Sequence, residues 1–141
     1  MAFWVWETVE DKAMTGFNTF KRLIAWQKGM DLVQAVYKLS GELPAGERYV
    51  LSQQMRRAAI SVPCNIAEGF GRCTRADFVR FLDIASGSLN ELETQLLVCV
   101  RVGHMDEQRI GGTMDLTLEV QRVVKGLIRS LQETSKPNIR A

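Results

Sequence analysis

The chain has 141 residues, of which 46% are hydrophobic and 24% charged, and its formal net charge is only +2. This length and composition exclude an intrinsically disordered chain and fit one globular domain that buries its own core. Three cysteines without a CxxC pair and a single histidine, His104, leave no set of zinc ligands at usable spacing. We therefore expect no metal site and no cofactor.

Residues 1–16 form an N-terminal extension that differs from the rest of the chain. Trp4 and Trp6 stand beside the acidic residues Glu7, Glu10 and Asp11, and no helical periodicity joins them. Two interpretations stay open, a disordered tail and an arm that docks on a partner. Acidic residues replace the basic ones of a signal peptide, and no apolar run approaches the roughly 18 residues that span a bilayer. We expect a cytoplasmic protein that does not bind membranes.

A first helix is predicted from Phe20 to Leu39, where apolar residues recur at helical spacing. Its expected core face consists of Leu23, Trp26, Met30, Val33 and Tyr37. The segment from Ser40 to Pro44 ends this helix, because glycine and proline interrupt helices.

A second helix is predicted from Glu47 to Phe70, although Pro63 lies inside it. Its apolar face keeps helical phase through the proline and contains Leu51, Met55, Ala58, Ala59, Val62 and Ile66. A proline inside a helix removes one backbone hydrogen bond and crowds the preceding turn, at a cost of about 3 kcal/mol. We therefore expect a kink at Pro63 that neighbouring groups compensate.

A polar seam runs beside this apolar face and consists of Gln54, Arg57, Ser61, Asn65, Glu68 and Arg72. Ser61 and Asn65 are candidates to bond the carbonyl that the proline leaves free, and Glu68 is expected to pair with Arg72. Together with Pro63, these residues predict a structural polar network.

A third helix is predicted from Arg75 to Val102, with Thr74 as its N-cap and Asp77 as the capping partner. Its core face contains Phe78, Phe81, Leu82, Ala85, Leu89, Leu92, Leu96 and Cys99. Beside that face lies a second polar seam of Ser88, Glu91 and Gln95, which we expect to face the first.

A fourth helix is predicted to begin after a turn closed by Gly103, to be capped by Asp106, and to end near Thr134. Its core residues are Leu116, Val120, Val123, Val124, Leu127 and Leu131. No segment alternates at period two, and the connections are short. Residues 17–135 are therefore predicted to form an all-α, antiparallel up-down four-helix bundle, followed by a tail at 136–141.

Further apolar residues lie outside the expected core faces: Leu32, Val36, Leu39, Val79, Leu97, Val98, Ile110, Leu118 and Ile128. A single bundle is not expected to bury all of them, so the surplus predicts self-association.

Two groups of basic residues are candidates for nucleic-acid binding. Arg122, Lys125 and Arg129 recur at helical spacing on one side of the fourth helix, and a second group consists of Arg56, Arg57, Arg72 and Arg75. Nearby acidic residues leave an ordinary solvated face as the alternative.

An enzymatic reading of the polar seams is weaker than the structural one. Ser61, Asn65 and Glu68 could in principle perform acid-base chemistry, but a proline that frees a carbonyl creates a local need for the same groups. A di-metal bundle needs Glu-x-x-His motifs, which the sequence lacks. We expect no catalytic residues and no enzymatic activity.

The second and third helices together resemble the family of 23S rRNA intervening-sequence proteins. The resemblance is carried by Gln53–Ala59, Ser61–Pro63, Asn65–Gly69, Phe78, Phe81, Leu82, Gly87–Leu89, Glu91–Leu92 and Gln95–Leu96, and it extends from Phe20 to Leu131. Cys64 and Cys73 depart from the small or polar residues more usual there, and residues 1–16 lie outside the family.

The resemblance implies a homopentameric ring of bundles encoded in intervening sequences of bacterial rRNA genes or elsewhere in the genome. The family is also similar to the accessory variability determinant of diversity-generating retroelements, which binds a reverse transcriptase and nucleic acid. The expected function is thus a non-enzymatic oligomeric scaffold for RNA, DNA or a nucleic-acid enzyme. The alternative is a protein-interaction adaptor that does not bind nucleic acid.

Overall fold

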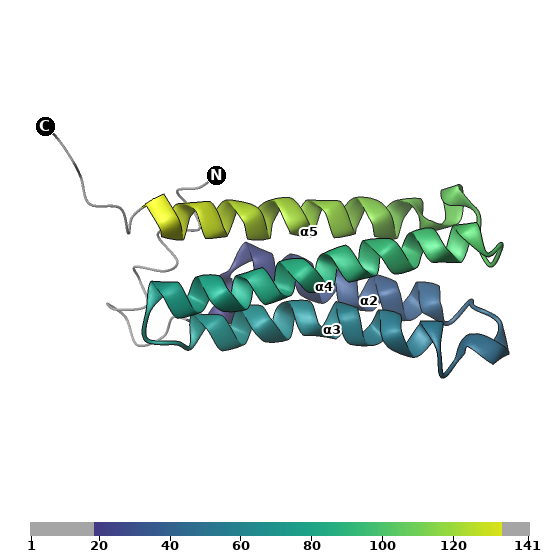
Figure 1. Ribbon diagram of the computed structural model, residues 1–141, viewed down its shortest axis with the longest axis horizontal. Helices are drawn as coiled ribbons and strands as arrows, with labels where there is room; N and C mark the ends of the chain where they lie inside the picture. The colour runs from purple at the N-terminus through teal and green to yellow at the C-terminus, as the bar shows by residue number, and fades with distance from the viewer. Residues whose placement is uncertain (1–18, 134–141) are drawn as a thin grey trace, which may run out of the picture.

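The structure is a computed structural model that describes residues 19–133, and within this range it contains four α-helices and no strand (Figure 1). The helices are α2 (Ile24–Ser40), α3 (Leu51–Phe70), α4 (Arg75–Arg101) and α5 (Glu107–Glu133). Two short 3-10 segments, η2 (Phe20–Arg22) and η3 (Ala45–Glu47), precede α2 and α3. The predicted all-α class is confirmed. Residues 1–16 and 136–141, predicted as the extension and the tail, lie outside the described range.

The four helices surround one hydrophobic core, as in a four-helix bundle. α3 packs against α2 and α4, and α5 packs against α4 and α2 (Figure 1). Contacts between α3 and α4 pair their residues in reverse order, from Phe70 beside Phe78 to Met55 beside Cys99. Among the described residues, no helix combines the length and apolar character needed to cross a membrane.

Both connections around α4 follow local sequence signals. The Thr74 hydroxyl accepts a hydrogen bond from the backbone N–H of Asp77 at 3.1 Å, as predicted for the N-cap. After α4, Gly103 adopts a φ of +80°, which favours glycine. The Asp106 carboxylate then accepts from the backbone N–H of Arg109 at 2.8 Å and caps α5. These three predictions are confirmed.

The helix α3 continues through Pro63, as its apolar phase predicted. Pro63 is buried, and Gly29 of α2 faces it, because a Cβ atom on Gly29 would lie 3.6 Å from the proline ring. At the other end of α3, a Cβ atom on Gly69 would lie 2.8 Å from Phe78 and Phe81. Glycines therefore allow α3 to lie close to α2 and to the first turns of α4.

The predicted core face of α2 is wrong. The helix buries Ala25, Gly29, Leu32, Val36 and Leu39 instead. Of the predicted residues only Leu23, just before the helix, is buried; Trp26 and Val33 are half-buried, whereas Met30 and Tyr37 are 44% and 43% exposed. Two apolar lines run side by side on this helix. The line that contains Ala25 and Gly29 faces the core, since its small residues permit contact with Pro63 of α3.

One bundle buries more of the surplus apolar residues than we expected from the sequence. Leu32, Val36, Leu39, Ile110 and Ile128 are all buried within the single chain. Val79 and Leu118 are half-buried. Only Leu97 and Val98 of the predicted surplus are exposed, at 54% and 39%. Ile84 of α4 and Val102 at its end are also exposed, at 44% and 55%, so the apolar surface that remains on this helix differs from the predicted set.

Candidate nucleic-acid interface

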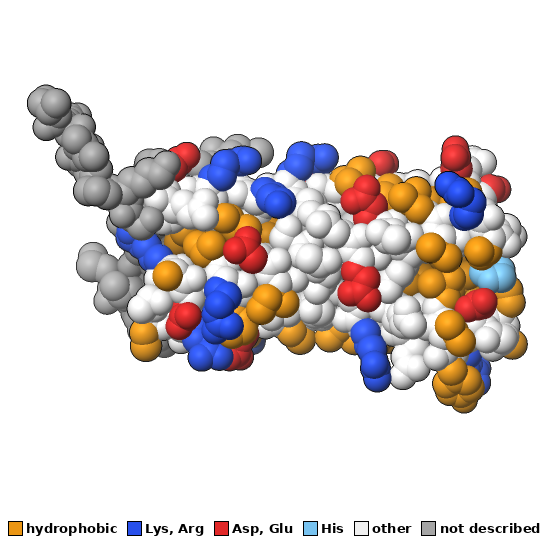
Figure 2. Space-filling view, in the orientation of Figure 1, with side chains coloured by type: hydrophobic (Ala, Val, Ile, Leu, Met, Phe, Trp, Pro, Cys, Tyr) orange, Lys and Arg blue, Asp and Glu red, His pale blue; other side chains and the backbone are white. Residues whose placement is uncertain are grey.

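A basic stripe lies on the C-terminal half of α5 and consists of Arg122, Lys125 and Arg129. The inward side of this helix is fixed by Val120, Val124 and other apolar residues that enter the core. The three cations occupy the outward side at spacings of three and four, and all are exposed. Figure 2 shows Lys and Arg side chains along the edge formed by α5.

The cations of the basic stripe, Arg122, Lys125 and Arg129, form no ion pair with another residue in the range 19–133. The neighbouring carboxylate, Glu119, is instead bonded to Lys28 of α2 at 2.6 Å. The hydrogen bond from Lys28 and its positive charge hold the pKa of Glu119 below its ordinary value. The charge of Arg122 also lowers the pKa of Glu119, so this carboxylate balances part of the stripe, while none of the three cations is held in an ion pair.

The second predicted basic group does not form one surface. Arg56 is half-buried, donates to the Ser40 hydroxyl at 2.9 Å, and lies 4.6 Å from the centre of the Tyr37 ring. Its neighbour Arg57 is exposed. Successive residues of a helix point about 100° apart, so Arg57 projects from a different side of α3. The tandem pair cannot act as a single site on one face.

Arg72 and Arg75 lie at the turn between α3 and α4, at the far end of α3 from Arg56. Fourteen residues of helix separate Arg56 from Phe70, about 21 Å along the axis, and Arg72 lies just beyond that end. Arg72 bonds Glu68 at 2.5 Å, as predicted, and its guanidinium lies 4.8 Å from the centre of the Phe81 ring. Arg80 lies 4.6 Å from the same ring, and Arg75 is exposed at the start of α4. Arg72 and Arg80 are thus engaged in local structure.

The two polar seams meet at Ser61 and Ser88, whose hydroxyl oxygens are 2.8 Å apart. The side-chain amide of Asn65 donates to the Ser61 hydroxyl and to the Ser61 carbonyl, both at 2.8 Å. Pro63 leaves free the carbonyl four residues earlier, that of Ala59, so Asn65 bonds a different carbonyl from the one expected. The network links α3 to α4 at the level of the proline.

The remaining seam residues are less connected than the sequence suggested. Gln54 is exposed, and so is Glu91, which accepts a hydrogen bond from Gln95 at 3.3 Å. Gln95 is buried, and its Oε1 atom has no hydrogen-bond partner in the described part of the chain. Glu68 is exposed and bonded to Arg72. The two carboxylates and Ser88 are therefore each engaged locally, on two different helices.

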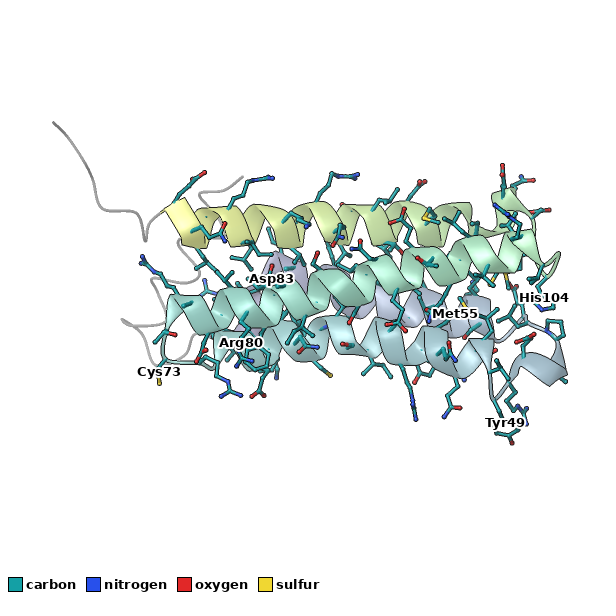
Figure 3. All side chains as sticks on the ribbon, viewed as in Figure 1. Tyr49, Met55, Cys73, Arg80, Asp83 and His104 are labelled. Atoms are coloured by element: carbon teal, nitrogen blue, oxygen red, sulfur yellow. The ribbon has the colours of Figure 1, made fainter. Side chains whose placement is uncertain are left out.

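The residues that could bind metals are scattered. Within residues 19–133, no group of three or more His, Cys, Asp or Glu side chains could hold a metal ion. His104 pairs with Glu47 at 3.2 Å. Figure 3 places His104 and Cys73 at opposite ends of the molecule.

Sequence reasoning missed two features that bear on function. The first is the pairing of Lys28 with Glu119, which joins residues 91 positions apart and leaves no periodic signal within either helix. The second is a groove of about 400 Å³ between the C-terminal part of α4 and the start of α5, lined by Leu97, Val100, Ile110 and Met114 among others. Figure 2 shows hydrophobic side chains at this end of the molecule. Leu97 and Ile110, both in the predicted apolar surplus, were its sequence signals.

The fold and the site define an all-α protein of four helices with a basic stripe on its last helix and a polar network between its second and third. The chain belongs to the 23S rRNA-intervening sequence protein family, whose model matches residues 21–126.

A solved structure supports this assignment at the level of the fold. It is that of a protein of unknown function from the S23 ribosomal protein family of Bacteroides thetaiotaomicron. The two share 23% sequence identity with a TM-score of 0.70, over 75% of this chain and 99% of that one. At this identity the similarity concerns the fold alone. No curated protein matches the chain.

Proposed function

We propose that this protein is a non-enzymatic, cytoplasmic scaffold that binds nucleic acid through the basic stripe of α5. The observation that carries the proposal is the combination of three exposed cations without ion pairs and a neighbouring carboxylate bonded to Lys28 of α2. Arg122, Lys125 and Arg129 are spaced to follow one helix face, as a phosphate backbone requires. Affinity for phosphates rises with the number of cations that contact them.

The scaffold is proposed to be a homopentameric ring of antiparallel up-down bundles, each kinked at Pro63. The reverse order of the contacts between α3 and α4 supports the antiparallel arrangement. Exposed apolar side chains on α4, Leu97, Val98 and Val102, support self-association. A ring repeats every surface patch by symmetry, so five copies of the basic stripe would act together where one binds weakly.

Structured RNA is the proposed ligand class, in keeping with a family named for the intervening sequences of 23S rRNA. A nucleic-acid enzyme such as a reverse transcriptase is the corresponding protein partner. A second candidate function, an adaptor that binds only protein, is favoured by the apolar groove between α4 and α5. The two candidates differ in whether the chain binds RNA at moderate salt.

The test replaces all three stripe cations, as Arg122→Glu, Lys125→Glu and Arg129→Glu. Retention on structured RNA is expected to fall by about tenfold or more, because up to three phosphate contacts per chain are lost. Light scattering should give the same mass as for the parent. A matched control places the same charge change on other exposed positions, as Lys21→Glu, Lys38→Glu and Arg48→Glu.

The outcomes separate the two candidates. Unaltered binding by the stripe variant, or an equal loss in the control, would refute the assignment of the stripe. A parent protein that does not bind RNA at moderate salt would favour the adaptor.

A further inference from the structure

An apolar surface extends over α2 and α3, away from the basic stripe of α5. On α2 it consists of the line beside the buried one, Trp26, Met30, Val33 and Tyr37, of which Trp26 and Val33 pack partly against the core. On α3 it continues with Ile60, which is 38% exposed, and with the exposed Cys64. Both follow Arg56 at intervals of four residues, and Arg56 contacts Tyr37, so they lie on the side of α3 next to this line. We call these six residues the α2–α3 face.

The α2–α3 face is more than scattered surface hydrophobicity. Four successive positions of one helical line are apolar, and no polar residue interrupts them. Met30 and Tyr37 are about as exposed as they are buried, so the described chain leaves much of their surface in contact with water. Contiguous exposed apolar surface of this kind marks a docking site.

The chain itself contains a segment suited to this face. Residues 3–6 read Phe-Trp-Val-Trp and are followed within five positions by Glu7, Glu10 and Asp11. Residues 19–72, which form α2 and α3, carry eight Lys and Arg against four Asp and Glu; residues 73–133, which form α4 and α5, carry seven against nine. Averaged over each half, an acidic segment is therefore favoured by the half of the molecule that bears the apolar face, although the α5 stripe is a local exception in the other half.

The length of the connection permits this docking within one chain. The described chain begins at Thr19, just before the end of α2 that carries Trp26. The α2 line rises about 16 Å from Trp26 to Tyr37, at 1.5 Å per residue. Residues 12–18 span up to about 23 Å when extended. A segment tethered so closely has an effective concentration in the millimolar range.

We infer that residues 3–11 dock on the α2–α3 face of their own chain, with the aromatic side chains on the apolar line and the carboxylates toward the basic half. The extension then acts as an intramolecular cover that shields this face from other proteins. This docking would explain the aromatic and acidic composition of residues 3–11, which the family fold does not explain.

Native residues allow a direct test by paramagnetic NMR. Cys64 lies on the face, and the chain has only three tryptophans, Trp4, Trp6 and Trp26, so three indole N–H signals report on the docking. Burial protects Cys99 from labelling and raises the pKa of its thiol. A nitroxide on Cys64 in a Cys73→Ser chain is expected to broaden all three signals, with Trp26 as the internal reference.

The control carries the nitroxide at the C-terminal end of α4, which packs against α3 and α5, at Arg101→Cys in a chain without Cys64 and Cys73. There, the Trp4 and Trp6 signals are expected to stay sharp. Sharp Trp4 and Trp6 signals with the label at Cys64, or equal broadening from both label positions, would overturn the inference.

Two further samples test the chemistry and the origin of the docking. The double variant Glu7→Lys, Glu10→Lys is expected to lose the broadening of Trp4 and Trp6. The neutral control Thr8→Ala should retain it. Broadening that survives the charge reversal would refute the electrostatic part of the inference. Mixing isotope-labelled chains with separate nitroxide-bearing chains should leave the signals sharp. Broadening in that mixture would show docking on a second copy and would overturn the own-chain assignment.

Discussion

Gly69 lies where the last turn of α3 passes against the first turns of α4, and its replacement by alanine tests how tightly these helices are packed. The new Cβ atom would lie 2.8 Å from Phe78 Cδ2 and from Phe81 Cβ, and 3.2 Å from the Phe78 carbonyl oxygen. Phe78 is buried and its ring packs edge-on against Phe70, with centroids 6.1 Å apart. The ring therefore cannot turn away without disturbing the core.

The change in stability of Gly69→Ala depends on two opposed effects, helix propensity and overpacking. Alanine gains up to about 1 kcal/mol over glycine within a helix, and less in a last turn. Overpacking of a well-filled core costs typically about 1–3 kcal/mol. Because two of the contacts lie below 3.0 Å, the packing term dominates for Gly69→Ala. We expect a net destabilisation of about 1–2 kcal/mol.

Gly87→Ala provides the matched control, since it makes the same chemical change inside α4. Apart from the adjoining residues and backbone of α4 itself, no heavy atom of the described chain lies within 4 Å of a Cβ atom at Gly87. This variant should therefore be stabilised by about 0.5–1 kcal/mol. Thermal unfolding should move in opposite directions for the two variants, by roughly 4 °C per kcal/mol. A Gly69→Ala variant as stable as the parent would refute the close packing of α3 on α4.

Three further predictions concern single interactions. Asn65→Leu removes the two hydrogen bonds to Ser61 and should lower stability by about 1–2 kcal/mol in urea unfolding; an equally stable variant would argue that the amide serves a ligand. Thr74→Ala removes the N-cap of α4 and should cost about 1 kcal/mol in the same assay, whereas Thr74→Ser should retain most of it. The pKa of Glu119 is lowered in the folded chain by Lys28, so its stabilising contribution is present above the unfolded pKa and is lost as the pH falls through the folded pKa. The stability difference between the parent and Glu119→Gln should therefore shrink on acidification below about pH 4.5, and a constant difference would contradict the pairing.

Local signals in the sequence were sufficient for much of the fold. The caps at Thr74 and Asp106 and the turn at Gly103 depend on neighbouring residues alone, and all three were predicted correctly. The core face of α3 was also predicted, because only one apolar line runs through Pro63. On α2 two apolar lines compete. The choice between them depends on how closely Gly29 approaches Pro63 of another helix, which periodicity within α2 does not report.

The candidate site was predictable to a similar degree. The meeting of the polar seams at Ser61 and Ser88 followed from their matching spacing on adjacent helices. The second basic group was wrongly predicted to form one surface, because neighbours in sequence such as Arg56 and Arg57 project from different sides of a helix. The charge of the α5 stripe depends on Lys28, a residue far away in the sequence that pairs with a carboxylate beside the stripe.

The salt dependence of RNA binding tests the central claim, that an assembled protein contacts nucleic acid through repeated copies of the α5 stripe. One chain with three phosphate contacts gives a slope of log affinity against log salt of about −2 to −3. An assembly in which several stripes contact one RNA is expected to give a steeper slope, which the triple Glu variant at Arg122, Lys125 and Arg129 should reduce. Affinity that does not change with salt, or an unchanged slope in the variant, would contradict the account.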